Sequence, residues 1–527
     1  MSEGIFDFEL SRRRLLQAAG LGGGALLASQ FSAGAAEPVQ RTNVPPVTGL
    51  HLQFGEDASS QMVVSWWALE AVQNPRLLLG GPDGRLLEAA KAQETSYTDA
   101  KSGRKVHVFH ASLARLKPGT TYMYAAVHDG AEPEFGTFKT APRGRAPFTF
   151  TSFGDQGTPT LGREQPAPPQ ASPSSTAPGT VTYVNDNLGS PFAADTTLGV
   201  ERLKPLFHLL NGDLCYANLA EDRVRTWWDF WANNSRSAKN RPWMPAPGNH
   251  ENERGNGPVG YQAYQTYFAL PRADGQSEAT RGLWYAFTAG SVRVITLAND
   301  DVAYQDGGDS YVRGYSQGAQ AAWLEKELAA TRADRAIDWI VVCMHQVAIS
   351  TADKFNGADL GIREEWLPLF DRHGVDLVVC GHEHHYERSH PLRGREENAT
   401  LTPRASATAL DVIDTSKGTV HMVIGGGGTS ITSNRLFFDP PRCRVITRVG
   451  EPNANGKRPP VYVTEDAPWS AVRNPAHAYG FAHFAVDPGT GPGASTSITV
   501  TYYDVVGRDG AVAAFERFTL QRPRRDG

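Results

Sequence analysis

Residues 375–384 have the sequence Val-Asp-Leu-Val-Val-Cys-Gly-His-Glu-His. The first six are mostly apolar and β-branched, which is typical of a strand buried in an α/β sheet. The run stops at Gly381, and two histidines separated by one residue follow it. Ligands of α/β domains bind beyond the carboxyl ends of the strands, and imidazole is the commonest metal ligand in proteins. This stretch therefore predicts a buried strand with candidate metal ligands at its end.

Four further motifs repeat this arrangement of a strand-like run followed by polar side chains. In chain order the five motifs are Gly154-Asp155-Gln156-Gly157, Gly212-Asp213-Leu214-Cys215-Tyr216, Gly248-Asn249-His250-Glu251, Val342-Cys343-Met344-His345 and Gly381-His382-Glu383-His384. A single Gly-Asp after a strand usually marks a turn, and a single His-x-His pair is weak evidence for a metal. Five such motifs in one chain predict one site assembled from several strand ends.

The strand-like runs alternate with helical patterns, which predicts an α/β domain over residues 147–527 with its sheets buried between helices. The runs are 148–153, 206–210, 337–344 and 375–380. A helix is expected over residues 317–335, with Ser316 as its N-cap and Ala321, Leu324 and Leu328 on one face. Residues 478–520 alternate like strands and are expected to close a sheet.

Residues 47–142 are predicted to form a small all-β domain. Residues 61–67, Gln-Met-Val-Val-Ser-Trp-Trp, have strand composition. Residues 116–124 follow the pattern Leu-x-Pro-Gly-Thr-x-Tyr-x-Tyr, a turn and then an alternating strand. The pattern resembles the strand entry of fibronectin type III sandwiches, where a tyrosine packs across the corner. No candidate catalytic residues are concentrated here, so a structural or docking role is expected.

Residues 1–36 are predicted to be a signal peptide rather than part of the fold. Ser11-Arg12-Arg13-Arg14-Leu15-Leu16 is a twin-arginine pattern, and a Gly/Ala-rich stretch with a small-residue cleavage site follows it. We expect export in the folded state to the periplasm, the cell envelope or the medium, and no stable membrane insertion. Residues 37–46 are expected to be a linker, and the Pro-rich residues 158–193 to be an insertion that acts as a spacer rather than a lid.

Composition and charge narrow the classes of function. The chain has 527 residues, of which 40% are apolar, and a formal net charge of -5. A nucleic-acid partner is not expected, because such proteins need a basic face. Four cysteines are too few for a disulfide framework, and we expect them to be small buried residues. The aromatic residues Trp227, Trp228, Phe230 and Trp231 are expected to pack rather than to stack on a substrate.

The residue types of the five motifs suit phosphoryl chemistry at two metals. Two ions about 3.5–4 Å apart can hold the attacking and leaving oxygens of a phosphoryl group. One carboxylate must then bridge the ions, and imidazole and carboxylate suit iron, zinc and manganese. A tyrosine phenolate is a hard anionic donor, which favours a trivalent ion such as Fe(III).

The motif set resembles that of the purple acid phosphatases, within the superfamily of dimetal metallophosphoesterases. The resemblance covers roughly residues 45–520. It rests on the order of the five motifs, on the Tyr of Gly-Asp-x-x-Tyr, and on the sandwich that precedes the catalytic domain. It implies a four-layer α/β domain, in which helices flank two β-sheets, behind a fibronectin III-like domain.

The resemblance also implies a role for each motif residue. The enzyme would hydrolyse small phosphate monoesters by attack of a metal-bound hydroxide, with His250 stabilising charge or donating a proton to the leaving oxygen. By the family pattern, Fe(III) is held by Asp155, Tyr216 and His384, a divalent Fe, Zn or Mn ion is held by Asn249, His345 and His382, and Asp213 bridges the two.

One departure from the family keeps alternatives open. Plant members carry a further His pair shortly after the fourth motif, but residues 346–364 contain no histidine. Lys354 and Asn356 are the polar candidates in that stretch. A phosphodiesterase or nucleotide-cleaving enzyme with the same two-metal core, such as the alkaline phosphatase D type, is the main alternative. A secreted binding protein with a vestigial site is disfavoured, because all seven ligands are present. The oligomeric state stays open.

Overall fold

The computed structural model describes residues 44–80, 85–160, 189–305, 308–353, 356–429, 437–454, 456–474, 476–477 and 479–527. The predicted signal peptide lies outside these residues, as does most of the predicted Pro-rich insertion. Within the described residues, no helix is long and apolar enough to cross a membrane. All four cysteines are buried and free.

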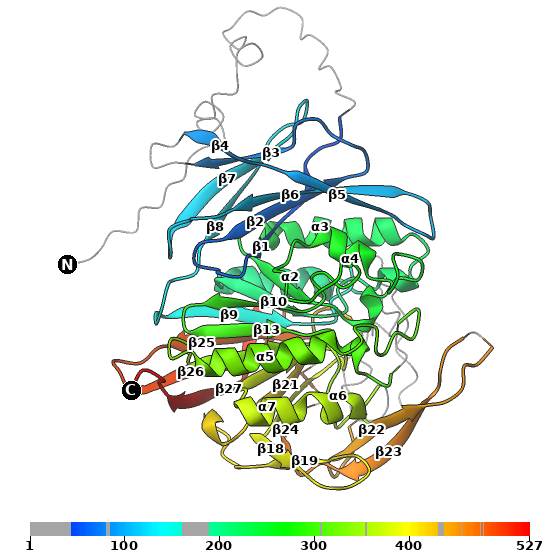
Figure 1. Cartoon of the computed structure of the whole chain (residues 1–527), viewed down its shortest axis with the longest axis vertical. Helices are drawn as coiled ribbons and strands as arrows, with labels where there is room; N and C mark the ends of the chain where they lie inside the picture. Colours follow the sequence, from blue (N-terminus) through cyan, green and yellow to red (C-terminus); the bar gives the residue numbers. More distant parts are fainter. Residues whose placement is uncertain are drawn as a thin grey trace, which may run out of the picture.

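The N-terminal domain is a sandwich of two four-stranded antiparallel sheets (Figure 1). The hydroxyl of Tyr122 accepts a hydrogen bond from the backbone N–H of Lys117 at 2.8 Å, so this tyrosine spans the corner as the sequence pattern predicts. One sheet has the order β1 (Thr48–Phe54), β2 (Met62–Ala68), β6 (Lys105–Leu113), β5 (Gln93–Thr98), and the other β4 (Leu86–Lys91), β3 (Arg76–Gly80), β7 (Thr121–Val127), β8 (Glu134–Lys139).

Two seven-stranded sheets form the centre of the second domain. The first has the order β11 (Trp243–Ala246), β10 (Phe207–Asn211), β9 (Phe148–Phe153), β25 (Gly480–Asp487), β26 (Ser495–Val505), β27 (Val512–Pro523), β20 (Val412–Asp414). The second has the order β12 (Tyr285–Ala289), β13 (Val292–Thr296), β14 (Trp339–Cys343), β16 (Leu377–Cys380), β21 (Val420–Ile424), β17 (Tyr386–Ser389), β24 (Ser470–Arg473).

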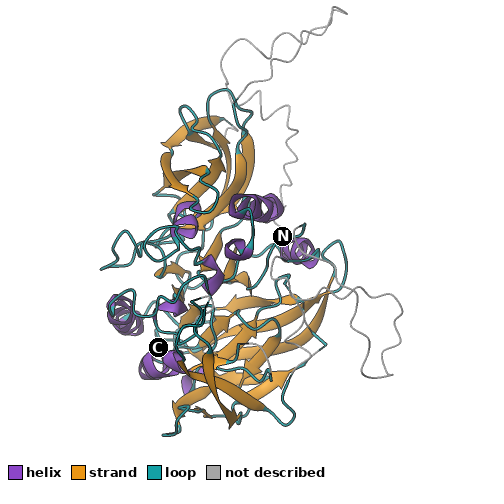
Figure 2. Ribbon diagram, turned by 90° about the vertical axis from the view of Figure 1, so that its right-hand side faces the viewer, coloured by secondary structure: helices purple, strands orange, loops and turns teal. Residues whose placement is uncertain are grey.

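The two sheets face each other, because β10 contacts β14 and β21 contacts β25. Helices α2 (Phe192–Leu203) and α3 (Arg223–Ala238) lie on the side of the first sheet, and α2 contacts β25 and β26. Helices α5 (Ala319–Ala333) and α7 (Leu367–His373) lie together on the side of the second sheet (Figures 1 and 2). The predicted architecture, a sandwich followed by two sheets flanked by helices, is confirmed.

Parallel pairing sets the direction of the strand ends. Strands β9, β10 and β11 are parallel to one another, as are β13, β14, β16 and β21. The C-terminal hairpin strands β25, β26 and β27 extend the first sheet from β9, as expected from their alternation. The carboxyl ends of both parallel sets therefore meet at one edge of the stacked sheets.

The helix prediction was right in position and wrong in its cap. The structure has α5 at Ala319–Ala333, and its N-cap is Gly318, not Ser316. Ser316 lies two residues before the N-cap, and its hydroxyl donates to the Asp301 carboxylate at 2.5 Å. The Ser316 oxygen also accepts a hydrogen bond from the backbone N–H of Gln320 at 3.3 Å, but the backbone is left-handed at Gln317 and Gly318, so the helix begins only after them.

Helix α3 joins the two domains. It contacts β1 of the sandwich, and the Trp231 indole stacks on the His51 imidazole with ring centroids 3.9 Å apart. Trp227, Phe230 and Trp231 are buried, while Trp228 is 38% exposed. The aromatic run is therefore mostly packing at the domain interface, as expected.

Candidate metal centre

The eight predicted site residues come together at the carboxyl ends of the strands. Asp155 follows β9, Asp213 follows β10, and His382 follows β16 within two residues of the strand end. Facing sheets bring these ends together, although the residues lie up to 229 positions apart in the chain. The contacts divide the site into two groups of polar atoms, and His250 lies beside the second.

The first group consists of Asp155, Tyr216 and His384. The Tyr216 hydroxyl is 3.1 Å from Asp155 Oδ1 and 3.1 Å from His384 Nε2. His384 Nε2 is 3.2 Å from Asp155 Oδ1. The three donor atoms thus form a nearly equilateral triangle in a buried place. Carboxylate, phenol and imidazole groups are all metal-ligand types, so the three atoms can bind one ion.

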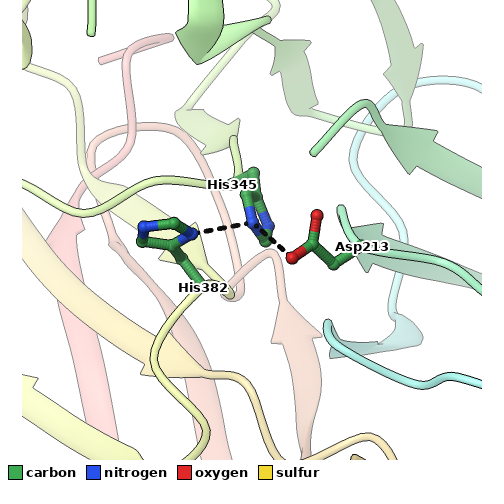
Figure 3. Close-up of side chains that lie close together, drawn as sticks. All are labelled: Asp213, His345 and His382. Carbon is green, nitrogen blue, oxygen red and sulfur yellow. Dashed lines mark hydrogen bonds and ion pairs between the residues drawn. The ribbon is translucent and has the colours of Figure 1, made fainter. Parts of the chain in front are cut away.

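The second group surrounds His345 Nε2. This nitrogen is 3.0 Å from His382 Nδ1 and 3.1 Å from Asp213 Oδ2 (Figure 3). It is also 3.0 Å from Asn249 Oδ1. The other ring nitrogen, Nδ1, lies 2.7 Å from the carbonyl oxygen of Asn211, to which it must donate. His345 Nε2 can carry at most one proton and so donate one hydrogen bond, yet three atoms with lone pairs lie within 3.1 Å of it. A shared cation satisfies this set better than hydrogen bonds do.

Asp213 presents one oxygen to the second group. Its Oδ1 accepts a hydrogen bond from the backbone N–H of His250 at 2.9 Å, which leaves Oδ2 for the site. Burial acts against the charge of Asp213, but the nearby His345 and His250 outweigh burial and lower the pKa of this carboxylate. Burial likewise opposes protonation of His345, and Asp213 overcomes it, raising the pKa of His345 to about 10. The pocket therefore requires positive charge. The bridging role of Asp213 stays a prediction.

Tyr216 needs a strong cation to ionise. Burial, followed by the charges of Asp155 and Asp213, raises the pKa of its phenol well above the usual 10. At any physiological pH the phenol would keep its proton unless a bound ion displaced it. Tyr216 can therefore act as a phenolate ligand only when a metal ion binds to its oxygen.

Backbone strain marks the same residues. Asp155, Asp213, Tyr216 and His382 have φ values of 58°, 52°, 57° and 71°. Non-glycine residues adopt this left-handed region at a cost, and such residues cluster at functional sites. Sequence reasoning predicted the residues but had no signal for their strain.

Glu251 was missed by sequence reasoning. Its carboxylate accepts hydrogen bonds from the backbone N–H groups of Asp213, Leu214 and Gly248 at 2.9, 2.8 and 2.7 Å. Glu251 thereby connects its own motif, residues 248–251, to the motif at residues 212–216 by hydrogen bonds. Its position beside Asn249 and His250 in the third motif was the available signal, but a carboxylate that binds backbone rather than metal cannot be recognised from spacing.

His250 lies at the rim of the site. Its Nε2 is 4.0 Å from Asp213 Oδ2, farther than any predicted ligand contact. Its Nδ1 is 2.9 Å from Asn218 Oδ1. The Asn218 amide faces Asp309, so its oxygen is left to accept the Nδ1 proton of His250. Burial lowers the pKa of His250. Asn218 is a second residue that sequence reasoning missed.

Residues 346–364, which contain no histidine, contribute Asn356 to the site. Its side-chain N–H donates to the backbone carbonyl of His382 at 3.1 Å, and its oxygen accepts from Gln305 at 2.8 Å. Lys354 lies outside the described residues. Gln305, which reaches His382, was also missed, because nothing in its sequence neighbourhood points to the site.

Comparison with known proteins identifies relatives of both domains. A model of the purple acid phosphatase N-terminal domain matches residues 47–141, and a model of the calcineurin-like phosphoesterases matches residues 180–386. An uncharacterized protein of Mycobacterium tuberculosis is 58% identical over 98% of this chain and 96% of its own. A purple acid phosphatase of Glycine max is 30% identical over 50% of this chain and 53% of its own. The structure of a purple acid phosphatase from yellow lupin seeds matches with a TM-score of 0.62 and 20% identity, covering 92% of this chain and 75% of that one.

Proposed function

This chain belongs to the purple acid phosphatase family of metal-dependent phosphoesterases, and from this premise we propose that it hydrolyses phosphate monoesters at a centre of Fe(III) and one divalent ion. The observation that carries the proposal is the triangle of Asp155, Tyr216 and His384, 3.1–3.2 Å on a side, next to the polar atoms around His345.

In this proposal Asp155, Tyr216 and His384 hold Fe(III), while Asn249, His345 and His382 hold the divalent Fe, Zn or Mn ion. Asp213 would be the ligand common to both ions. When bound, such a pair of ions clamps the attacking and leaving oxygens of the phosphoryl group and lowers the pKa of the attacking water.

His250 serves the leaving group in this proposal. Asn218 accepts a hydrogen bond from His250 Nδ1–H, so Nε2 is the nitrogen on the side of Asp213. Nε2 carries a proton only when the ring is an imidazolium, and the lowered pKa of His250 restricts that form to acidic pH. That N–H stabilises the charge that develops on the phosphoryl and leaving oxygens and can be donated to the latter. The side chain is 14% exposed, which gives it access to a substrate at the rim.

Charge supports a monoester over a diester. A monoester phosphoryl group carries up to two negative charges, whereas a diester carries one. Two metal ions and an imidazolium at the rim match the doubly charged group better. The relatives from soybean and lupin are named phosphatases, which agrees with this choice.

The test is a side-by-side assay of the metal-loaded protein with a nitrophenyl phosphate monoester and the matching diester, from pH 4 to 9. Faster monoester cleavage with an acidic optimum supports the proposal. Faster diester cleavage at alkaline pH would keep the metal centre but assign the protein to the phosphodiesterase alternative. A folded, metal-loaded protein that cleaves neither substrate would contradict both.

We also propose export by the twin-arginine route, on the basis of the pattern at residues 11–16. Replacement of Arg12 and Arg13 by lysine tests it. The full-length chain should then stay in the cytoplasm at its uncleaved size. Unchanged export of the double variant would contradict the proposal.

A further inference from the structure

Three residues form a closed ring of hydrogen bonds beside the second group. His382 Nε2 is 2.5 Å from Gln305 Oε1, Gln305 Nε2 donates to Asn356 Oδ1 at 2.8 Å, and Asn356 Nδ2 donates to the backbone carbonyl of His382 at 3.1 Å. Gln305 follows the short helix η3 (Asn299–Asp301), and Asn356 precedes strand β15 (Ala358–Asp359). Neither residue belongs to any of the five motifs.

The ring fixes the proton positions without ambiguity. A backbone carbonyl can only accept, so Asn356 must present its NH₂ group to His382. The Asn356 oxygen is then turned to Gln305 and accepts from the Gln305 NH₂ group. The Gln305 oxygen is left facing His382 Nε2, which must donate to it. His382 therefore carries its proton on Nε2 and a lone pair on Nδ1.

That lone pair points into the predicted metal position. His382 Nδ1 lies 3.0 Å from His345 Nε2 (Figure 3). His345 is oriented the opposite way, with its proton on Nδ1 held by the Asn211 carbonyl. Two imidazoles thus face each other through different nitrogens, each held by a different acceptor behind it.

Gln305 is anchored to the fold rather than to the site. Its backbone N–H donates to Asp359 Oδ2 at 3.0 Å, and the neighbouring N–H of Tyr304 donates to Asp359 Oδ1 at 3.1 Å. Asp359 is 1% exposed and caps helix α6 (Leu360–Glu365) through the N–H of Gly361. The backbone of Gln305 is therefore held by contacts outside the predicted metal site.

We propose that Gln305, oriented by Asn356, is the positioning residue that fixes the His382 tautomer for binding the divalent ion. The inference rests on the proposed metal centre. Acceptors behind a metal-binding imidazole orient the ring and raise its basicity, and their loss typically weakens metal affinity about 10–100-fold. In this protein the acceptor is a neutral amide rather than a carboxylate.

The experiment measures the dissociation constant of Zn²⁺ for the protein that retains its iron, by competition with a chelator. Gln305→Ala and the near-isosteric Gln305→Met both lack the acceptor, and each should weaken Zn²⁺ binding about 10–100-fold. Gln305→Glu keeps an acceptor for Nε2–H and should bind Zn²⁺ as tightly as wild type or more tightly. Gln93→Ala, on exposed β5 of the sandwich, is the matched control.

A second readout separates this proposal from a general loss of the site. The visible absorption of iron bound to tyrosinate should be the same in all four variants. Equal Zn²⁺ affinity in wild type, Gln305→Ala and Gln305→Met would overturn the inference, as would a Gln305→Glu variant as weak as Gln305→Met. A wild-type protein that binds no second ion would instead contradict the proposed metal centre itself.

Discussion

At the scale of single residues, the short motifs determine which side chains line the site, whereas residues far away in the chain determine how the histidine rings are oriented. Asp155, Asp213 and the motif histidines could be predicted from the sequence, because each follows a strand-like run and belongs to a short pattern. The tautomers could not, because they depend on Asn211 and Gln305, which lie 134 and 77 positions from the histidines they orient. Such contacts exist only after the strands are stacked.

His250 provides the first prediction at this scale. His250→Ala should lower kcat about 10²–10⁴-fold, the usual contribution of a positioned proton donor, because its Nε2 is the proposed donor at the rim. Both metals should stay bound, since this ring is not a predicted ligand. Steady-state kinetics and metal analysis check this. Asn218→Ala should cause a smaller loss. Loss of a metal ion from His250→Ala would contradict the assigned role.

Gly248 provides the second prediction. A Cβ at this position would lie 2.2 Å from Asp213 Oδ1 and 2.4 Å from the Asp213 backbone nitrogen. Gly248→Ala should therefore displace Asp213 and reduce both activity and metal content, although the backbone itself is extended and tolerates alanine. Gly491→Ala is the control, because no atom lies within 4 Å of its added Cβ. If both variants bind two ions equally, the close packing of Gly248 on Asp213 is unimportant.

At the scale of elements, the pattern of apolar residues predicted the positions of strands and helices better than single polar residues predicted helix caps. Strand β9 matches the predicted range 148–153, because a short run bounded by a Pro and a Gly leaves little choice. The N-cap of α5 was misplaced by two residues, because the backbone is left-handed at Gln317 and Gly318 and the helix begins after them. The hairpin of β22 (Arg442–Val449) and β23 (Pro460–Asp466) was not predicted, since its strands are half exposed and highly charged.

Helix α3 gives a prediction for the domain interface. Trp231 is fully buried between α3 and β1 and stacks on His51. Trp231→Ala should reduce the free energy of unfolding by about 3–5 kcal/mol, the range for deleting a large buried aromatic side chain. Trp228→Ala, three residues earlier on the exposed face, should change it little. Denaturant unfolding of both variants measures the difference. Equal losses of unfolding free energy in the two variants would show that the packing of Trp231 against the sandwich does not stabilise the protein.

At the scale of the whole molecule, a buried charge cluster links the two domains. Arg223 of α3 lies 3.6 Å from Asp99 of the sandwich and 4.0 Å from Glu253 of the catalytic domain. Glu253 is fully buried and also accepts hydrogen bonds from Trp227 and Asn256. Burial raises the pKa of Glu253 from 4.5 to about 7.

Stability should therefore depend on pH through Glu253. Between about pH 4.5 and 7 the folded state holds a proton on Glu253 that the unfolded state releases. The stabilisation is present below pH 4.5 and is lost as the pH rises through 7, and it amounts to at most about 3 kcal/mol. Glu253→Gln stays neutral, so its melting temperature relative to wild type should rise across this window. A difference that is constant with pH would contradict the raised pKa.

The central claim is that Tyr216, with Asp155 and His384, holds Fe(III) beside a divalent ion. The most direct test is metal analysis together with the visible spectrum of wild type and Tyr216→Phe. The account predicts one iron and one divalent ion in wild type, with a charge-transfer band from phenolate to Fe(III) that Tyr216→Phe abolishes. Two divalent ions and no visible band in wild type, or an unchanged band in Tyr216→Phe, would contradict it.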